Sequence, residues 1–229
     1  MYKEFLIIFT IVIIHELGHV LVSKVFRWNL EKIDIYPFGG CVKFNEKLNK
    51  PIYEELLILL GGPVVQLLLF LLVSFLFRLN FISMRNYILF KNYHYTLLCF
   101  NLLPIYPLDG GRILNCIINY LLPYKKGNKL IVYISIILII FLLYFERKNI
   151  NFIFFEILLF IEGLIYLKRQ NYLFNRLLLE RYLEKYKFKR CRVIRNKDNF
   201  YKSKRHVIKI NDKYITENSF LKERFEHKL

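Results

Sequence analysis

The chain has 229 residues, of which 55% are hydrophobic and 17% aromatic, and its mean hydropathy is +0.32. This composition excludes an ordinary soluble domain and is typical of a membrane protein with several spans. The formal charge of +17 is concentrated in residues 168–229, which hold 19 Lys and Arg against 7 Asp and Glu. Because no nucleic-acid-binding motif accompanies this charge, we expect no nucleic-acid partner and a tail that lies near anionic lipid.

The first predicted element is a membrane-spanning helix over residues 5–26, which contains the sequence HELGH at 15–19. Ionisable side chains at the centre of a bilayer cost about 3 kcal/mol each, so a compensating interaction is expected there. On a helix, His15 and His19 share one face and can direct a ring nitrogen at one Zn²⁺ ion. Glu16 is then placed to exchange protons with a water molecule at that ion. The segment therefore predicts a zinc site within the membrane.

A short hairpin is predicted between the first two spans, over residues 32–44. Apolar and polar residues alternate on both sides of the sequence Phe38-Gly39-Gly40, which predicts two strands joined by a glycine turn. An ordinary polar loop is the alternative. A strand edge beside a membrane site can hold a substrate backbone by strand addition. Phe38, Gly39 and Gly40 are therefore candidate substrate-binding residues.

Four further apolar stretches are long enough to be candidate spans, at residues 57–77, 87–103, 130–145 and 150–167. If the tail is cytoplasmic, the inner segments carry 27 Lys and Arg and the outer segments carry 6. Cytoplasmic loops of membrane proteins carry such an excess of Lys and Arg, so this orientation is favoured. We therefore predict an α-helical polytopic membrane protein with about five transmembrane helices and a small membrane-associated hairpin. Residues 1–167 form its membrane domain, and residues 168–229 form a basic cytoplasmic tail.

A catalytic zinc ion usually has three protein ligands, so a third is expected outside HELGH. Asp109 is one candidate, because prolines and glycines flank it in NLLPIYPLDGGR at 101–112 and predict a broken backbone lining a cavity. His94, Glu156 and Glu162 remain alternatives, with pairing inside the helix bundle the simpler role for the two acids. We expect exposed histidines at 206 and 227, and free thiols at Cys41, Cys99, Cys116 and Cys191.

Four motifs resemble those of the site-2 protease family of intramembrane zinc metalloproteases: HELGH at 15–19, PFGG at 37–40, GGP at 61–63 and NLLPIYPLDGGR at 101–112. The resemblance implies that His15, His19 and Asp109 bind zinc and that Glu16 is catalytic. It places Asn101 near the substrate. It also implies a three-helix catalytic core formed by residues 5–26, 57–77 and 87–121.

Within this family the motifs are most similar to the stage IV sporulation branch, whose members process a membrane-tethered pro-sigma factor. The resemblance implies that substrate class, inhibitory membrane-protein partners, and a bacterial inner membrane with the tail in the cytoplasm of the mother cell. The chain departs from the branch in three ways. It starts at the HELGH helix, it has Gln66 where the family often has Asn, and its tail has room for only part of a CBS-like regulatory module.

Three other functions are alternatives to this one. A membrane zinc protease of another class would use a downstream Glu in place of Asp109. A non-catalytic membrane scaffold or regulator would keep the fold without the reaction. A metal transporter would need ligands on several spans, and the sequence does not show such a series.

Overall fold

The computed structural model describes residues 2–28, 30–36, 39–44, 48–146, 150–184, 186–188, 190–210 and 213–226. The chain forms two compact units, the first of Met1–Glu46 and Tyr53–Leu103 and the second of Lys47–Ile52 and Pro104–Leu229. The chain thus leaves the first unit for a short segment before it begins its second long helix. The predicted division into residues 1–167 and 168–229 stays a prediction.

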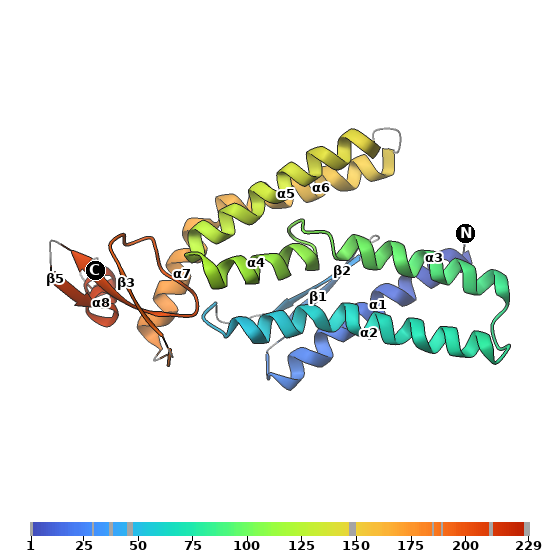
Figure 1. Cartoon of the computed structure of the whole chain (residues 1–229), viewed down its shortest axis with the longest axis horizontal. Helices are drawn as coiled ribbons and strands as arrows, with labels where there is room; N and C mark the ends of the chain where they lie inside the picture. The colour runs from blue at the N-terminus through green and yellow to red at the C-terminus, as the bar shows by residue number, and fades with distance from the viewer. Residues whose placement is uncertain are drawn as a thin grey trace. The chain divides into compact units, whose positions relative to one another are not determined.

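Three long helices make up most of the first unit: α1 (Tyr2–Val25), α2 (Ile52–Arg78) and α3 (Met84–Asn101). Figure 1 shows α1 crossing α2. At the crossing the two backbones touch, since a Cβ atom on Gly61 would lie 2.7 Å from the carbonyl oxygen of Gly18. The close helix packing that the small residues of GGP predict is therefore confirmed.

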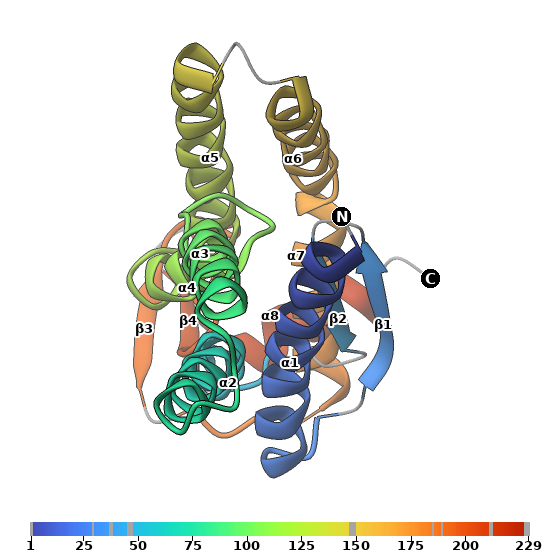
Figure 2. The ribbon, with the colours of Figure 1, turned by 90° about the vertical axis from the view of Figure 1, so that its right-hand side faces the viewer.

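Two antiparallel strands follow α1, β1 (Leu30–Tyr36) and β2 (Gly39–Phe44). Their register pairs Ile33 with Val42 and Tyr36 with Gly39, and β2 lies against α1 (Figure 2). The strands lie where the hairpin is predicted. Gly39 and Gly40 begin β2, whereas Phe38 lies outside the described residues.

Within the described part of the chain, three helices are long and apolar enough to cross a membrane: Tyr2–Val25, Ile52–Arg78 and Tyr124–Tyr144. They correspond to the first, second and fourth predicted spans. The third and fifth predicted spans are also helical, as α3 and as α6 (Ile150–Lys168). That α3 and α6 cross the membrane stays a prediction.

The second unit begins with α4 (Asp109–Leu121) and continues with α5 (Tyr124–Glu146), α6 and α7 (Gln170–Leu183). α5 and α6 pack against each other as a helical hairpin (Figure 2). A Cβ atom on Gly163 of α6 would lie 3.5 Å from Val132 Cγ1 of α5, which is an ordinary contact. α4 is joined to α5 by a hydrogen bond of 2.7 Å from Asn119 Nδ2 to Asn128 Oδ1.

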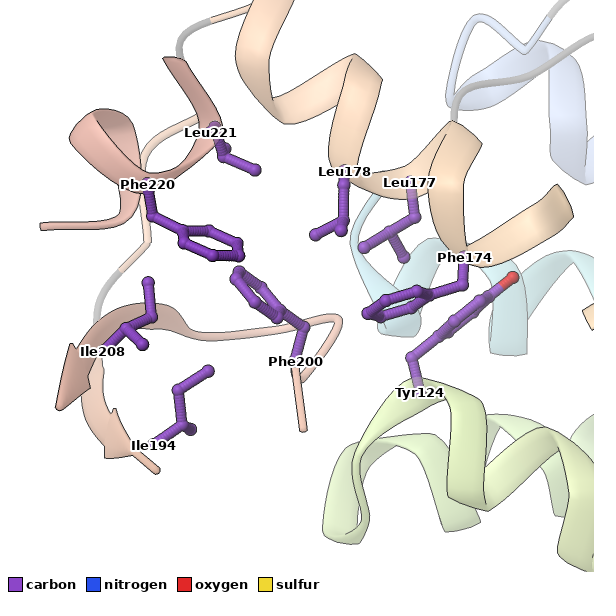
Figure 3. Close-up of a cluster of buried hydrophobic side chains, with 9 residues drawn as sticks. All are labelled: Tyr124, Phe174, Leu177, Leu178, Ile194, Phe200, Ile208, Phe220 and Leu221. Atoms are coloured by element: carbon purple, nitrogen blue, oxygen red, sulfur yellow. The ribbon is translucent and has the colours of Figure 1, made fainter. Parts of the chain in front are cut away.

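The tail contains a three-stranded sheet and a final helix: β3 (Cys191–Ile194), β4 (Arg205–Ile210), β5 (Lys213–Thr216) and α8 (Glu217–Glu226). β4 is central, parallel to β3 and antiparallel to β5. Figure 3 shows the apolar core that joins the sheet and α8 to α7 and to the start of α5. Its nine buried members are Tyr124, Phe174, Leu177, Leu178, Ile194, Phe200, Ile208, Phe220 and Leu221. That the tail is part of a CBS-like module stays a prediction.

A buried polar network lies beside this core, centred on Arg181, which is 5% exposed. Its guanidinium donates to Asn49 Oδ1 at 2.6 Å and to Glu217 Oε1 at 3.0 Å. His206 Nδ1 lies 3.1 Å from Glu217 Oε2, and His206 Nε2 accepts the N–H of Tyr201 at 2.9 Å. The prediction that His206 is exposed is wrong, because both ring nitrogens are engaged and its exposure is 1%. His227 lies outside the described residues.

The network sets the charge of its members. Burial lowers the pKa of His206, and the charge of Arg181 acts in the same direction. Burial alone would raise the pKa of Glu217, but the hydrogen bond from His206 and the charge of Arg181 outweigh it and the pKa is lowered. At neutral pH the network therefore holds a neutral imidazole between a carboxylate and a guanidinium.

We expect the tail to lose stability as the pH falls below about 6.5, the unfolded pKa of histidine. The unfolded chain takes up a proton on His206 that the folded tail resists, and Glu217 adds the same effect at lower pH. The unfolding equilibrium should shift by up to about tenfold per pH unit for one proton. Pulse proteolysis of the tail at pH 7.5 and 5.5 measures this. A His206→Gln variant, which cannot titrate, should show a flatter response, and equal responses would contradict the prediction.

Candidate metal centre

α1 brings together the three ionisable residues of HELGH. One ligand atom each from His15, Glu16 and His19 lies within 4.8 Å of the others, which agrees with the predicted helical face. The three side chains are 2%, 8% and 5% exposed. The cluster is thus removed from solvent within the first unit, where charged or polar groups require specific partners.

The orientation of His19 is fixed by α2. Its Nδ1 lies 2.8 Å from the backbone carbonyl oxygen of Ile58. A carbonyl oxygen can only accept a hydrogen bond, so Nδ1 carries the proton. In the neutral ring, Nε2 then carries a lone pair. This is the arrangement in which a carbonyl orients a metal-binding histidine.

His15 is also oriented by α2, through the side chain of Gln66. Its Nδ1 lies 2.9 Å from Gln66 Oε1, and Gln66 Nε2 donates to the carbonyl oxygen of His94 at 3.1 Å. This second bond fixes which end of the amide is the oxygen, so His15 Nδ1 must donate to it. Gln66 is fully buried. The sequence marks this residue only as a departure from the family pattern, and the structure gives it the role of orienting His15.

The two Nε2 atoms face each other at 3.2 Å, with the rings at 77°. Two nitrogen lone pairs at this distance repel unless a positive centre lies between them. Zinc–nitrogen bonds of about 2.0–2.1 Å in a tetrahedral site place two nitrogen ligands roughly 3.3–3.4 Å apart. The donor set and its spacing therefore fit a zinc ion.

Gly62 leaves the space that the two imidazoles occupy. A Cβ atom at this position would lie 2.7 Å from His15 Nε2 and closer still to His19 Nε2. Gly62 and Gln66 are four residues apart on α2 and therefore lie on the same face. That spacing places both residues on one side of α2, but the sequence alone does not show that this side meets HELGH.

The other predicted site residues lie on different elements. Asn101 is the last residue of α3, in the first unit, and Asp109 is the first residue of α4, in the second. Gly39 and Gly40 belong to β2, next to α1 in the first unit. That Asp109 completes the metal site, and that Asn101 and β2 contact a substrate, stay predictions.

The alternative ligands have other surroundings. The His94 ring is fully buried and stacks on Phe70 at 4.7 Å, and its carbonyl oxygen supports Gln66. On α6, Glu156 is buried and Glu162 is exposed. The free thiols that the structure describes, as predicted, are Cys99, Cys116 and Cys191.

Comparison with known proteins decides the family. The model of Peptidase family M50 matches residues 4–93 and 78–142, which is more than half of the chain and includes HELGH and NLLPIYPLDGGR. The chain belongs to peptidase family M50. Its M50 relatives include stage IV sporulation protein FB of Bacillus subtilis, at 33% identity over 191 residues. A zinc metalloprotease of Methanocaldococcus jannaschii is 34% identical over 160 residues.

The fold agrees with this assignment. The site-2 protease from Methanocaldococcus jannaschii matches with a TM-score of 0.52 and 29% identity, covering 73% of this chain and 75% of that one. The sequence matches cover 80% and 69% of this M50 chain, but 65% and 46% of the two relatives. The chain is a multi-pass membrane protein of the M50 family, whose metal cofactor is zinc.

Proposed function

We propose that this M50 protein is an intramembrane zinc metalloprotease that hydrolyses a peptide bond of a membrane-associated protein. The observation that carries the proposal is the pair of Nε2 atoms at 3.2 Å on a membrane-spanning helix, each fixed by a bond at Nδ1, with Glu16 beside them. The names of the M50 relatives support the same reaction class.

The residues have distinct roles in this reaction. His15, His19 and Asp109 would hold zinc, which when bound supplies a Lewis acid that activates water and polarises a carbonyl group. Glu16 takes the proton of the attacking water on a carboxylate oxygen and later delivers it to the leaving amine. Asn101 donates a hydrogen bond to the oxyanion of the peptide. The roles of Asp109 and Asn101 are proposed because NLLPIYPLDGGR resembles the corresponding motif of the site-2 protease family.

β2 is the proposed docking strand for the substrate. A helical peptide bond is shielded by its own hydrogen bonds, so the substrate must be extended before cleavage. The hairpin has two strands, so β2 pairs with β1 along one edge, while β2 also lies next to α1. Strand addition along β2, starting at Gly39 and Gly40, would hold the substrate backbone beside HELGH.

The biological role that we propose is cleavage of a pro-sigma factor during sporulation, in a bacterial inner membrane with the tail on the cytoplasmic side. The similarity to stage IV sporulation protein FB supports it, together with the motifs shared with that branch. Membrane proteins that inhibit the protease would be its other partners. The excess of Lys and Arg in the tail supports the orientation.

The test is zinc content, because it needs no known substrate. Detergent-purified wild type should hold about one zinc per chain, and the Asp109→Ala variant should lose most of it. Glu162→Ala, an exposed acid of α6, is the matched control and should keep its zinc. Equal zinc in Asp109→Ala and wild type would overturn the third ligand. A well-folded wild type without zinc would overturn the protease and favour a non-catalytic scaffold.

A further inference from the structure

The loop of residues 104–108, which leads to Asp109, is held by α5 and α6 within the second unit. Its buried residue Ile105 is 1% exposed. The loop also closes on itself, since Leu108 N–H donates to the Ile105 carbonyl oxygen at 2.8 Å. Two further contacts hold this loop, and both come from helices outside the predicted three-helix core.

Ser135 of α5 makes the first contact. Its hydroxyl oxygen accepts the backbone N–H of Tyr106 at 2.8 Å. The same hydroxyl donates to the carbonyl oxygen of Ile131 at 2.8 Å. Ser135 is 1% exposed, so its hydroxyl is the partner that satisfies this loop N–H away from solvent.

Tyr166 of α6 makes the second contact. Its ring stacks on the ring of Tyr106, with centroids 4.1 Å apart and planes at 22°. Gly111 of α4 also lies against the loop, since a Cβ atom there would be 2.5 Å from the Tyr106 backbone nitrogen. Tyr106 is therefore held by its backbone, by its ring and by the helix that carries Asp109.

We propose that Ser135 and Tyr166 are positioning residues of the zinc site, which fix the loop that presents Asp109. The proposal rests on the proposed function, in which Asp109 is the third ligand. Asp109 lies three residues after Tyr106, so a shift of the loop moves its carboxylate directly. The helical hairpin of α5 and α6 thereby takes part in metal binding without supplying a ligand.

The test compares conservative and disruptive substitutions in the full chain in detergent. Zinc affinity is measured by competition with a chelator, and the visible spectrum of bound Co²⁺ reports the ligand geometry. Ser135→Ala and Tyr166→Leu should each weaken zinc by about 10-fold or more and alter the Co²⁺ spectrum. Ser135→Thr keeps the hydroxyl and Tyr166→Phe keeps the ring, so both should stay within about twofold of wild type.

Ser74→Ala is the matched control, because this hydroxyl lies on α2 and contacts Tyr87 instead. It should leave both measurements unchanged. Wild-type zinc affinity and spectrum in Ser135→Ala and Tyr166→Leu, with weak binding in Asp109→Ala, would overturn the positioning role alone. Wild-type binding in Asp109→Ala would overturn the third ligand and this proposal with it. Losses in the conservative variants as large as in the disruptive ones would mean disturbed packing, and would also overturn the proposal.

Discussion

Replacing Glu16 by Gln is expected to lower peptide hydrolysis by about 10³-fold while the protein keeps its zinc, since a positioned acid–base group contributes about 10²–10⁴-fold. The amide has the size of the carboxylate but cannot take a proton from water. His15 and His19 keep their bonds to Gln66 and Ile58, so metal binding does not depend on this change. Cleavage of a membrane-tethered reporter and zinc content, measured on the same preparation, test the prediction.

Glu4→Gln is the control, because it makes the same substitution near the start of the same helix. It should cleave at the wild-type rate. A Glu16→Gln variant that retains full cleavage would contradict the role of Glu16. Loss of zinc in that variant would instead show that the carboxylate takes part in holding the metal.

The second large effect is expected from Gly62→Ala, which should weaken zinc binding and cleavage together by about 10–100-fold, as changes around metal ligands do. Helix propensity alone predicts that the substitution stabilises the fold, since Ala stabilises a helix interior by about 1 kcal/mol relative to Gly. The added Cβ atom meets the ends of both imidazoles, which must turn away. The fold should survive, because the groups that move are side-chain ends. Zinc affinity and thermal unfolding separate these two effects.

Gly163→Ala offers the matched comparison on α6. Its Cβ atom would make only an ordinary contact with Val132, at 3.5 Å. We expect unchanged zinc affinity and an equal or higher unfolding temperature. If both variants keep wild-type zinc affinity, the two imidazoles do not need the space that Gly62 leaves.

Local geometry explains which parts of the site are predictable from the sequence. The spacing of His15 and His19 places both on one helical face, and the structure brings their Nε2 atoms to 3.2 Å. The Ile58 carbonyl lies 39 residues after its partner His19, and Gln66 lies 51 residues after its partner His15. These two bonds therefore depend on the crossing of α1 and α2. Periodicity does not carry that information. The ligand role of Asp109 rests on its motif for the same reason.

In the tail, the burial of a histidine could not be predicted from the sequence. A histidine within a segment rich in Lys and Arg predicts an exposed side chain, yet His206 is buried. Its partners Arg181 and Glu217 lie 25 and 11 residues away and themselves look like surface residues in the sequence. A charged residue is buried only with its partners, and the sequence does not show which charges meet.

Asn49 links the segment before α2 to the tail, with consequences for any shortened form of the protein. Its side-chain amide donates to the Leu177 carbonyl oxygen at 2.9 Å, and its amide oxygen accepts from Arg181. A chain that ends before α7 loses both bonds and frees the residues that lead into the helix bearing Ile58, Gly62 and Gln66. Deleting the tail therefore also removes contacts of the segment that leads into α2, and loss of activity after truncation would not by itself show that the tail binds a regulator.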